Sequence, residues 1–333
     1  MSEKNNPARR FCTAGLALAA LSAMLFAPVP TLAQGKYPDK PVKIILPFGA
    51  GGVADITTRL VAEKLGEKLG QRFVVENNPG AGGITAARAV LSSPADGYTL
   101  AVLSNGTAVS VGLFKALPFD PVKDFAPVSA MGYFDLILVT NANGPYKTLG
   151  DFVKAAKDKP GQLNIGTIAA GSSQNLGAEL FKSVAGINAV IVPFKTSGDV
   201  LVGLERNDIQ MATEFYAALR GSLDAKKFIP VALSGTQRGA YLPDAPTAKE
   251  AGEPKWEVTS WNAIFAPAGT PPDVIATLNK ALNEVLADPE VKKKALELGI
   301  DARGSTPQEI QARLKDDIVK WSDVIQKAGI EKR

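Results

Sequence analysis

Short apolar runs alternate with helix-like segments over the first third of the chain. The runs at residues 42–48, 72–76 and 98–104 predict strands, and residues 55–69 and 84–91 between them predict helices. Strands that alternate with helices form a parallel sheet with helices on both faces. Because the runs show little apolar–polar alternation, we expect both faces of these strands to be buried.

The same rhythm continues in a second series from residue 136 onward. Residues 256–267 are then predicted to be extended, and the chain becomes helical after Pro272. Thr306, Pro307 and Glu309 form a helix start, with a capping threonine, a proline at the first helical position and a glutamate three residues after the cap. The second series comprises predicted strands at 136–140, 163–168, 189–194, 209–213 and 228–234 and predicted helices at 149–157, 174–184 and 199–205.

A helical tail must bury its apolar faces, and the first series of elements is the nearest surface for it. We therefore predict an α/β protein of two lobes, each a mostly parallel sheet flanked by helices. The first lobe is discontinuous, 35–136 plus 263–333, and the second is 137–262. The chain then crosses between the lobes twice, and two crossings form a hinge that can close over a ligand.

The N-terminus has the pattern of a secretory signal. Lys4, Arg9 and Arg10 precede an apolar run at residues 14–27, which is shorter than the roughly 20 residues of a membrane-spanning helix. A small-residue cleavage site, Thr-Leu-Ala, follows at 31–33. We expect residues 1–33 to be removed during export, by either the general or the twin-arginine route.

The composition excludes several common kinds of catalytic and metal site. The chain has no histidine, which excludes Ser-His-Asp triads and histidine-ligated metals, and its one cysteine, Cys12, lies in the predicted signal. The formal net charge of +4 falls to +2 without the signal, because three basic residues and one acidic residue leave with it. So small a charge is not typical of nucleic-acid binding. We expect neither a metal nor a cofactor.

The first glycine loop, residues 49–54, follows a strand and opens a helix. Its sequence satisfies the dinucleotide fingerprint G-x-G-x-x-A, and Glu76 ends the next strand. Against this, Asp55 would compete with a pyrophosphate for the helix N-terminus. Two alternatives stay open for this loop and for the second glycine loop at 80–83. Either their N–H groups bind a small anion such as a carboxylate, or the loops are only turns.

The second series offers similar positions at its strand ends. Ser172 and Ser173 lie between a strand and a helix, where they can cap the helix or help to bind an anion. Neither serine belongs to a G-x-S-x-G nucleophile motif. Lys195 and Glu214 end later strands, and open α/β sheets bind ligands at the carboxyl ends of their strands. A solvated surface lysine explains Lys195 equally well.

Blocks of sequence spread over nearly the whole chain share a pattern. They are YPDKPVKIILPF at 37–48, VEN at 75–77, PGAGG at 79–83, PADGYTL at 94–100, LPFDP at 117–121, LPDAPT at 242–247 and APAGTP at 266–271. In this order they resemble the Bug-type periplasmic solute-binding proteins of tripartite tricarboxylate transporters. The resemblance implies a two-lobed, type II-like periplasmic binding protein, located in the periplasm after cleavage near Ala33.

The resemblance also implies a function and a site. The protein would be a monomer and no enzyme, and it would deliver a small organic carboxylate to the membrane permease subunits of the transporter. The loop 48–55 would hold one carboxylate through backbone amides and ordered water, and strand ends of the second lobe would supply the other contacts. The predicted ligand-binding residues are Phe48, Gly49, Ala50, Gly51, Gly52, Asp55, Ser104, Asn105, Gly171, Ser172, Ser173, Gln174, Lys195, Thr196 and Glu214.

Departures from the family pattern fall in the second lobe. Asn175 stands where the family often has histidine, Phe194 where it usually has tyrosine and Glu214 where aspartate is frequent. The family's glycine after the lysine position is either replaced by Ser197 or shifted to Gly198. The ligand is therefore harder to predict than the fold, and the sequence leaves open mono-, di-, tri- and aromatic carboxylates.

Two other hypotheses stay open beside the transport receptor. One is a nucleotide-dependent, Rossmann-like oxidoreductase, and the other is a ligand-sensing binding protein that delivers to a receptor. Replacing Glu76 by alanine separates the oxidoreductase from the binding proteins, because it should abolish dinucleotide binding but barely affect carboxylate capture.

Overall fold

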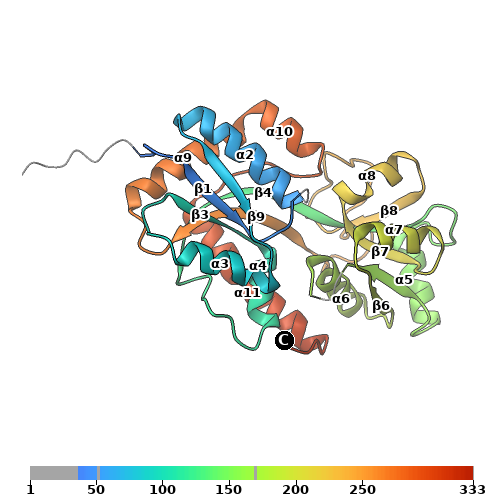
Figure 1. The fold of residues 1–333 in the computed structure, drawn as a ribbon. Helices are drawn as coiled ribbons and strands as arrows, with labels where there is room; N and C mark the ends of the chain where they lie inside the picture. The colour runs from blue at the N-terminus through green and yellow to red at the C-terminus, as the bar shows by residue number, and fades with distance from the viewer. Residues whose placement is uncertain (1–36, 51–52, 169–170, 333) are drawn as a thin grey trace, which may run out of the picture. The chain divides into compact units, whose positions relative to one another are not determined.

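One long strand, β4 (Phe125–Asn141), runs through both halves of the fold in the computed structural model (Figure 1). The structure describes residues 37–50, 53–168 and 171–332. The predicted export signal and cleavage site, residues 1–33, lie outside the described residues. In the described part of the chain, every helix is too short or too polar to span a bilayer.

The first lobe contains a mixed sheet with the order β2-β1-β3-β9-β4. The three outer strands β2 (Phe73–Asn77), β1 (Val42–Leu46) and β3 (Thr99–Ser104) are parallel, as predicted. The strand β9 (Thr259–Pro267) then pairs antiparallel with both β3 and β4. The sheet is therefore parallel on one side and antiparallel on the other.

Helices cover both faces of this sheet (Figure 1). On one face, three helices pack against one another: α2 (Val53–Leu69), α9 (Pro272–Ala287) and α10 (Pro289–Leu296). The other face carries η2 (Ala81–Gly83), α3 (Ile84–Leu91), α4 (Asn105–Leu113) and α11 (Pro307–Lys327).

The second lobe repeats the arrangement with a second mixed sheet. Its three parallel strands are β6 (Val190–Pro193), β5 (Asn164–Thr167) and β7 (Met211–Phe215), in that order across the sheet. The second half of β4 pairs antiparallel with β7 on one side and with β8 (Phe228–Leu233) on the other. The helices of this lobe are α5 (Leu149–Asp158), α6 (Ser173–Ala185), α7 (Ser197–Glu205) and α8 (Tyr216–Asp224).

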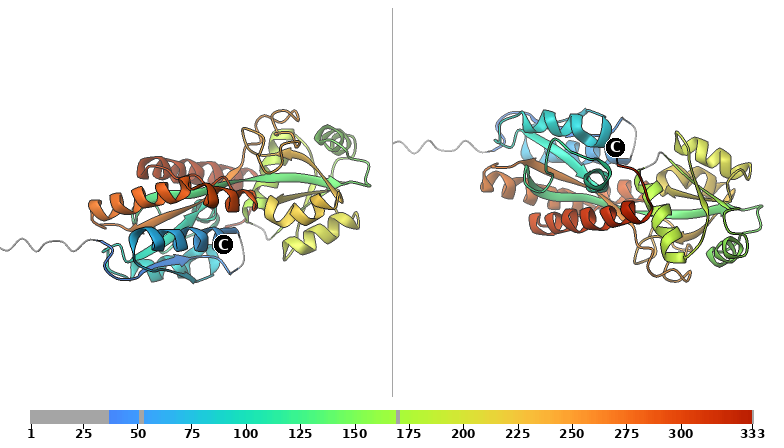
Figure 2. Two further views of the ribbon diagram at one scale, coloured as in Figure 1. Left: turned by 90° about the horizontal axis from the view of Figure 1, so that it is seen from above. Right: turned by 90° about the horizontal axis from the view of Figure 1, so that it is seen from below.

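The strand β4 joins the two sheets, and it appears as the long strand between the two groups of helices in Figure 2. It pairs with β9 up to Asp135 and with β7 and β8 from Leu136 onward. In the second lobe its side chains alternate between two cores: Leu136 and Leu138 pack in one, and Ile137 in the other.

The helical tail returns to the first lobe, as the sequence predicts. Thr306 and Glu309 form the predicted capping box, in which Thr306 Oγ1 accepts from Glu309 N at 3.2 Å and Glu309 Oε2 accepts from Thr306 N at 2.8 Å. The helix α11 then buries Leu314 and Trp321 against α4 and β4.

Three elements differ from the sequence prediction. The strand β4 begins at Phe125, well before the predicted 136, because its first half pairs with a strand more than 120 residues later in the chain. The helices α4 and α8 were not predicted. Two glycines and three β-branched residues give α4 little intrinsic helix propensity, so burial between β3 and α11 must stabilise it.

Candidate functional site

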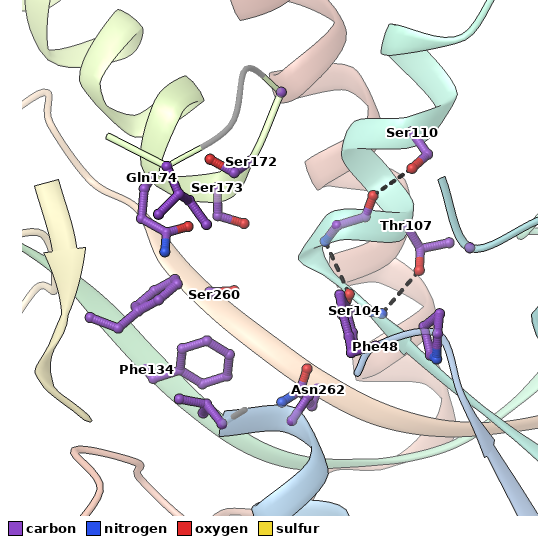
Figure 3. Close-up of a pocket in the computed structure, with 18 of the residues that line it drawn as sticks. Phe48, Ser104, Thr107, Ser110, Phe134, Ser172, Ser173, Gln174, Ser260 and Asn262 are labelled. Carbon is purple, nitrogen blue, oxygen red and sulfur yellow. Dashed lines mark hydrogen bonds between the residues drawn. The ribbon is translucent and has the colours of Figure 1, made fainter. Parts of the chain in front are cut away.

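A cavity of about 690 Å³ opens between the lobes, within the usual size range of small-molecule sites. Both lobes line it, as Figure 3 shows: Ser104, Thr107 and Ser110 come from β3 and α4, Ser172, Ser173 and Gln174 face them from the start of α6, and Phe134, Ser260 and Asn262 come from β4 and β9.

Six helices begin at this cavity, three from each lobe. Residues in or beside the first turns of α2, α3, α4, α6, α7 and α8 line it, because each of these helices directly follows the carboxyl end of a parallel strand. The first N–H groups of a helix have no partner within the helix, and the helix dipole makes this end positive. The cavity is therefore favourable for an anion without any basic side chain.

The start of α4 shows how the first lobe shapes its side of the cavity. Ser104 Oγ accepts from Gly106 N at 3.1 Å, and Ser104 N donates to Thr107 Oγ1 at 3.2 Å (Figure 3). Ser110 Oγ donates to the Gly106 carbonyl at 2.8 Å. This side of the cavity thus presents hydroxyls and backbone amides whose positions are fixed by capping.

The second glycine loop also lines the first-lobe side, through Gly80, Gly82 and Gly83. Gly82 has a φ of 61°, and a Cβ there would lie 2.6 Å from the Phe114 ring. Only glycine fits this position, so the loop can hold backbone close to a ligand.

Asn262 on β9 is a polar residue followed by an apolar stretch, Ala263–Pro267, of the same strand. It is 2% exposed and lines the cavity, and its Nδ2 has no hydrogen-bond partner among the described residues. A buried donor without a partner is costly, so a bound acceptor would relieve that cost.

In the second lobe, Glu214 is the one charged side chain in the described lining of the cavity. It is the penultimate residue of β7, is 1% exposed and accepts three hydrogen bonds from the described residues. Ser197 Oγ donates to its Oε1 at 2.7 Å, and Phe215 N and Gln174 Nε2 donate to its Oε2 at 3.0 and 3.3 Å. Burial raises the pKa of Glu214 above the usual carboxyl value, and these three bonds oppose the rise.

A hydrogen-bonded chain connects the lobes beside the cavity. Asn105 Nδ2, from the first turn of α4, donates to Ser173 Oγ, from the first turn of α6, at 2.8 Å. Trp321 Nε1 of α11 donates to Asn105 Oδ1 at 2.5 Å. Asn105 itself is buried and is absent from the described lining, so it links the lobes where the sequence suggested a ligand contact.

Asp55 lies in the first turn of α2 but outside the described lining of the cavity. Its Oδ1 accepts from Arg59 Nε at 3.0 Å and from Asn77 Nδ2 at 2.8 Å, and Asn77 Nδ2 also lies 3.0 Å from the Phe48 carbonyl. Asp55 therefore holds the end of β2 and the loop after β1 together, so its effect on a ligand is indirect.

Seven of the predicted site residues line the cavity: Phe48, Ser104, Gly171, Ser172, Ser173, Gln174 and Glu214. Gly49, Ala50, Asp55, Asn105, Lys195 and Thr196 are described but do not line it. Lys195 is exposed, and Thr196 caps α7 by accepting from Asp199 N at 3.2 Å. Gly51 and Gly52 lie outside the described residues.

Lining residues that lie inside strands or in unpredicted helices are not among the residues that the sequence predicts for the site. Phe134, Ser260 and Asn262 belong to β4 and β9, and Ala217 and Ala218 to α8. One signal was available, because Ser260 and Asn262 are polar residues within the predicted extended run 256–267.

The dinucleotide hypothesis gains no support from the geometry. Glu76, the residue it requires at the ribose, forms an ion pair with Lys43 at 2.9 Å and is not among the described lining residues. Within the described residues, no group of histidine, cysteine, aspartate and glutamate side chains could hold a metal ion.

Comparison with families of known sequence gives one family model that spans most of the chain. Residues 57–330 match the model of the tripartite tricarboxylate transporter family receptor. The protein BugT of Bordetella pertussis is 32% identical over 295 residues, which is 88% of this chain and 90% of BugT.

Solved structures agree with these matches. The protein Rpa4515 of R. palustris, with adipate, has a TM-score of 0.78 at 32% identity and covers 89% of this chain and 100% of its own. MatC from Rhodopseudomonas palustris, with bound malate, has a TM-score of 0.73 at 30% identity and covers 87% of this chain and 100% of its own. The similarity extends over both lobes.

Proposed function

The chain belongs to the tripartite tricarboxylate transporter receptor family, and from this premise we propose that it is an extracytoplasmic solute-binding protein for a small organic carboxylate. It captures the carboxylate between its lobes and delivers it to the membrane permease subunits of the transporter. It acts in the periplasm after removal of its export signal, and it catalyses no reaction.

The observation that carries this proposal is the convergence of six helix N-termini on one cavity. A carboxylate there receives N–H hydrogen bonds and the favourable field of the helix dipoles. The unpartnered Nδ2 of Asn262 adds a buried donor on the first-lobe side. The related proteins with adipate and malate support the same class of ligand.

The predicted lobes, 35–136 plus 263–333 and 137–262, close over the carboxylate by bending where β4 and the chain before β9 cross between them. In the proposal, the described bond between Asn105 and Ser173 is one of the contacts that stabilise the approach of the lobes. The closed form is the one that the permease recognises.

Thermal unfolding of the purified protein with a panel of ligands tests the proposal. The panel contains mono-, di- and tricarboxylates, aromatic acids and NAD. A ligand at about 100 times its dissociation constant stabilises the folded state by about 2.7 kcal/mol, which raises the melting temperature by several degrees. We expect such a rise with one class of carboxylate and none with NAD.

The outcomes separate the hypotheses of the sequence analysis. A rise with NAD alone would overturn the proposal in favour of the oxidoreductase. A rise with a carboxylate would support it, and deletion of the neighbouring permease genes should then abolish uptake of that compound. Uptake that persists without the permease would favour a sensing role.

A further inference from the structure

The Glu214 carboxylate occupies the place where three helices of the second lobe begin. Its three hydrogen-bond donors belong to the first turn of α6 (Gln174), the first residue of α7 (Ser197) and the N-cap of α8 (Phe215). The positive N-terminal ends of these helices are thus already next to an anionic group of the protein itself, the Glu214 carboxylate.

Among the residues that the structure describes, no cationic side chain is paired with this buried carboxylate. Lysine and arginine are absent from the described lining of the cavity, and Glu214 forms no ion pair within the described residues. A buried charge without a partner is costly, so protein interiors normally pair it. A ligand group in the cavity can complete the pairing of Glu214 in its ionised form.

Glu214 also has unused acceptor capacity. An ionised carboxylate has about four acceptor positions on its two oxygens. Among the described residues Oε2 accepts two hydrogen bonds and Oε1 accepts one. A donor on a ligand can therefore bind Oε1 without displacing Ser197.

The first-lobe side of the cavity has the opposite character. The starts of α2, α3 and α4 line it, with the hydroxyls of Ser104 and Thr107 and the nearby Asn262 amide, and no acidic side chain is present in its described lining. An anionic group is stabilised there, whereas a second anionic group at the other end would face Glu214 in a low-dielectric environment.

Resting on the proposed function, we propose that the ligand carries a single carboxylate, bound on the first-lobe side, and a hydrogen-bond donor at its far end, a hydroxyl or an ammonium, that binds Glu214. The site thereby discriminates against dicarboxylates. Discrimination arises from a repulsive element built into the protein as well as from the attractive donor ends of the helices.

The test uses sets of ligands that differ only in their far end. Isothermal titration calorimetry compares each dicarboxylate from succinate to pimelate with the ω-hydroxy, ω-amino and unsubstituted monocarboxylates of the same chain length. Terephthalate, 4-hydroxybenzoate and benzoate form an aromatic set. Titrations at about pH 8 keep both carboxyl groups of a free diacid ionised.

In the set that binds best, we expect the ω-hydroxy or ω-amino acid to bind at least about tenfold more tightly than the matching dicarboxylate, since one missing or repulsive charge contact in a buried site is worth 1.4 kcal/mol or more. The ω-amino arm and the ω-hydroxy arm distinguish a cationic donor from a neutral one.

Replacing Glu214 by glutamine tests the residue responsible. Glu214→Gln keeps the size of the side chain and removes its charge, so the preference over the dicarboxylate should shrink about tenfold. The matched control is Glu205→Gln, at an exposed ion pair with Lys227 in the same lobe, which removes the same charge and should leave the preference unchanged.

The outcomes distinguish a failure of this inference from a failure of the proposed function. If a dicarboxylate binds as tightly as its hydroxy and amino partners, the inference is wrong while the proposed function stands. An unchanged preference in Glu214→Gln would also overturn it, because Glu214 would then not be the selecting group. Binding of no member in any set would contradict the inference, and failure of the wider carboxylate panel as well would contradict the proposed function.

Discussion

A buried carboxylate lies close to helix starts in each lobe, Asp55 in the first and Glu214 in the second, and the two differ in their partners and in their position relative to the cavity. Asp55 in the first lobe is 3% exposed, has the Arg59 guanidinium at 3.0 Å and lies outside the described lining of the cavity. Glu214 in the second lobe is 1% exposed, lines the cavity, and has hydroxyl and N–H partners but no cationic partner within the described part of the chain.

The difference separates a structural carboxylate from a candidate selecting one. Asp55 is paired with Arg59 and Asn77 inside the protein. The free energy of these hydrogen bonds therefore stabilises the loop after β1. The hydrogen-bond donors to Glu214 among the described residues are all neutral, so a donor group on a ligand in the cavity can still stabilise its charge. Isosteric replacement of the two acids should therefore have opposite consequences.

The largest effect is expected from Asp55→Asn. Loss of the charge weakens two hydrogen bonds at once, to Arg59 and Asn77, and should lower the free energy of unfolding by about 1–3 kcal/mol. Urea unfolding measures the change. Glu67→Gln, at a more exposed position on the same helix, is the control and should change it by less than about 0.5 kcal/mol. Equal values for the two variants would show that Asp55 has no structural role.

The next effect concerns the link between the lobes. Asn105→Ala leaves the buried Trp321 Nε1 without its acceptor and should cost about 1–2 kcal/mol in urea unfolding. It also removes the bond to Ser173, so carboxylate affinity should fall several-fold. Ser173→Ala removes the bond between the lobes together with a hydroxyl of the cavity lining but keeps the bond from Trp321 to Asn105, so it should lower affinity with little change in tryptophan fluorescence. If both variants bind like the wild type, the link does not contribute to capture.

A smaller effect is expected from Ser197→Ala. The variant removes one of the three hydrogen bonds to Glu214, which should cost about 1 kcal/mol of folding free energy above pH 7. Because this bond lowers the pKa of Glu214, its loss should raise that pKa further. Ser222→Ala on α8 provides a comparison without a contact to Glu214. A titration of Glu214 followed by NMR that shows no upward shift would contradict the assignment.

The smallest change, with the opposite sign, is expected from Glu214→Gln in the absence of ligand. Since burial raises the pKa of Glu214, the folded protein holds this proton to a higher pH than the unfolded chain does. Wild-type stability therefore decreases as the pH rises from the ordinary carboxyl value through the raised one.

The glutamine variant lacks this decrease. We expect it to equal the wild type at acid pH and to melt slightly higher at about pH 8. Melting curves across this range measure the difference. A variant that is less stable than the wild type at alkaline pH would mean that the three hydrogen bonds outweigh the cost of burying the charge.

Local signals in the sequence predicted the elements that depend on neighbouring residues. The cap of α11 at Thr306 and the helix Ile84–Leu91 appear where the sequence places them. Seven of the ligand-binding residues that the family resemblance implies line the cavity, and they lie at the carboxyl ends of parallel strands, where such sheets bind ligands. Phe48, Ser104 and Glu214 are examples, since each ends or follows a predicted strand.

Long-range pairing accounts for most of what the sequence did not predict. Asn262 enters the site because β9 lies between β3 and β4, and that strand order joins segments far apart in the chain. Asp55 was predicted to contact the ligand from its position at a helix start. It lies off the cavity because Asn77, 22 residues later, supplies its partner from the neighbouring strand.

The sequence by itself determined the alternation of strands and helices, the absence of histidine chemistry and the family resemblance, because these depend on composition and local pattern. Tertiary structure decided which side chains share the cavity and which charges are paired. The direction of a side chain and the distance to its partner depend on strand order and register. Only the folded chain therefore shows that Arg59 pairs with Asp55, while Glu214 lines the cavity with no cationic partner among the described residues.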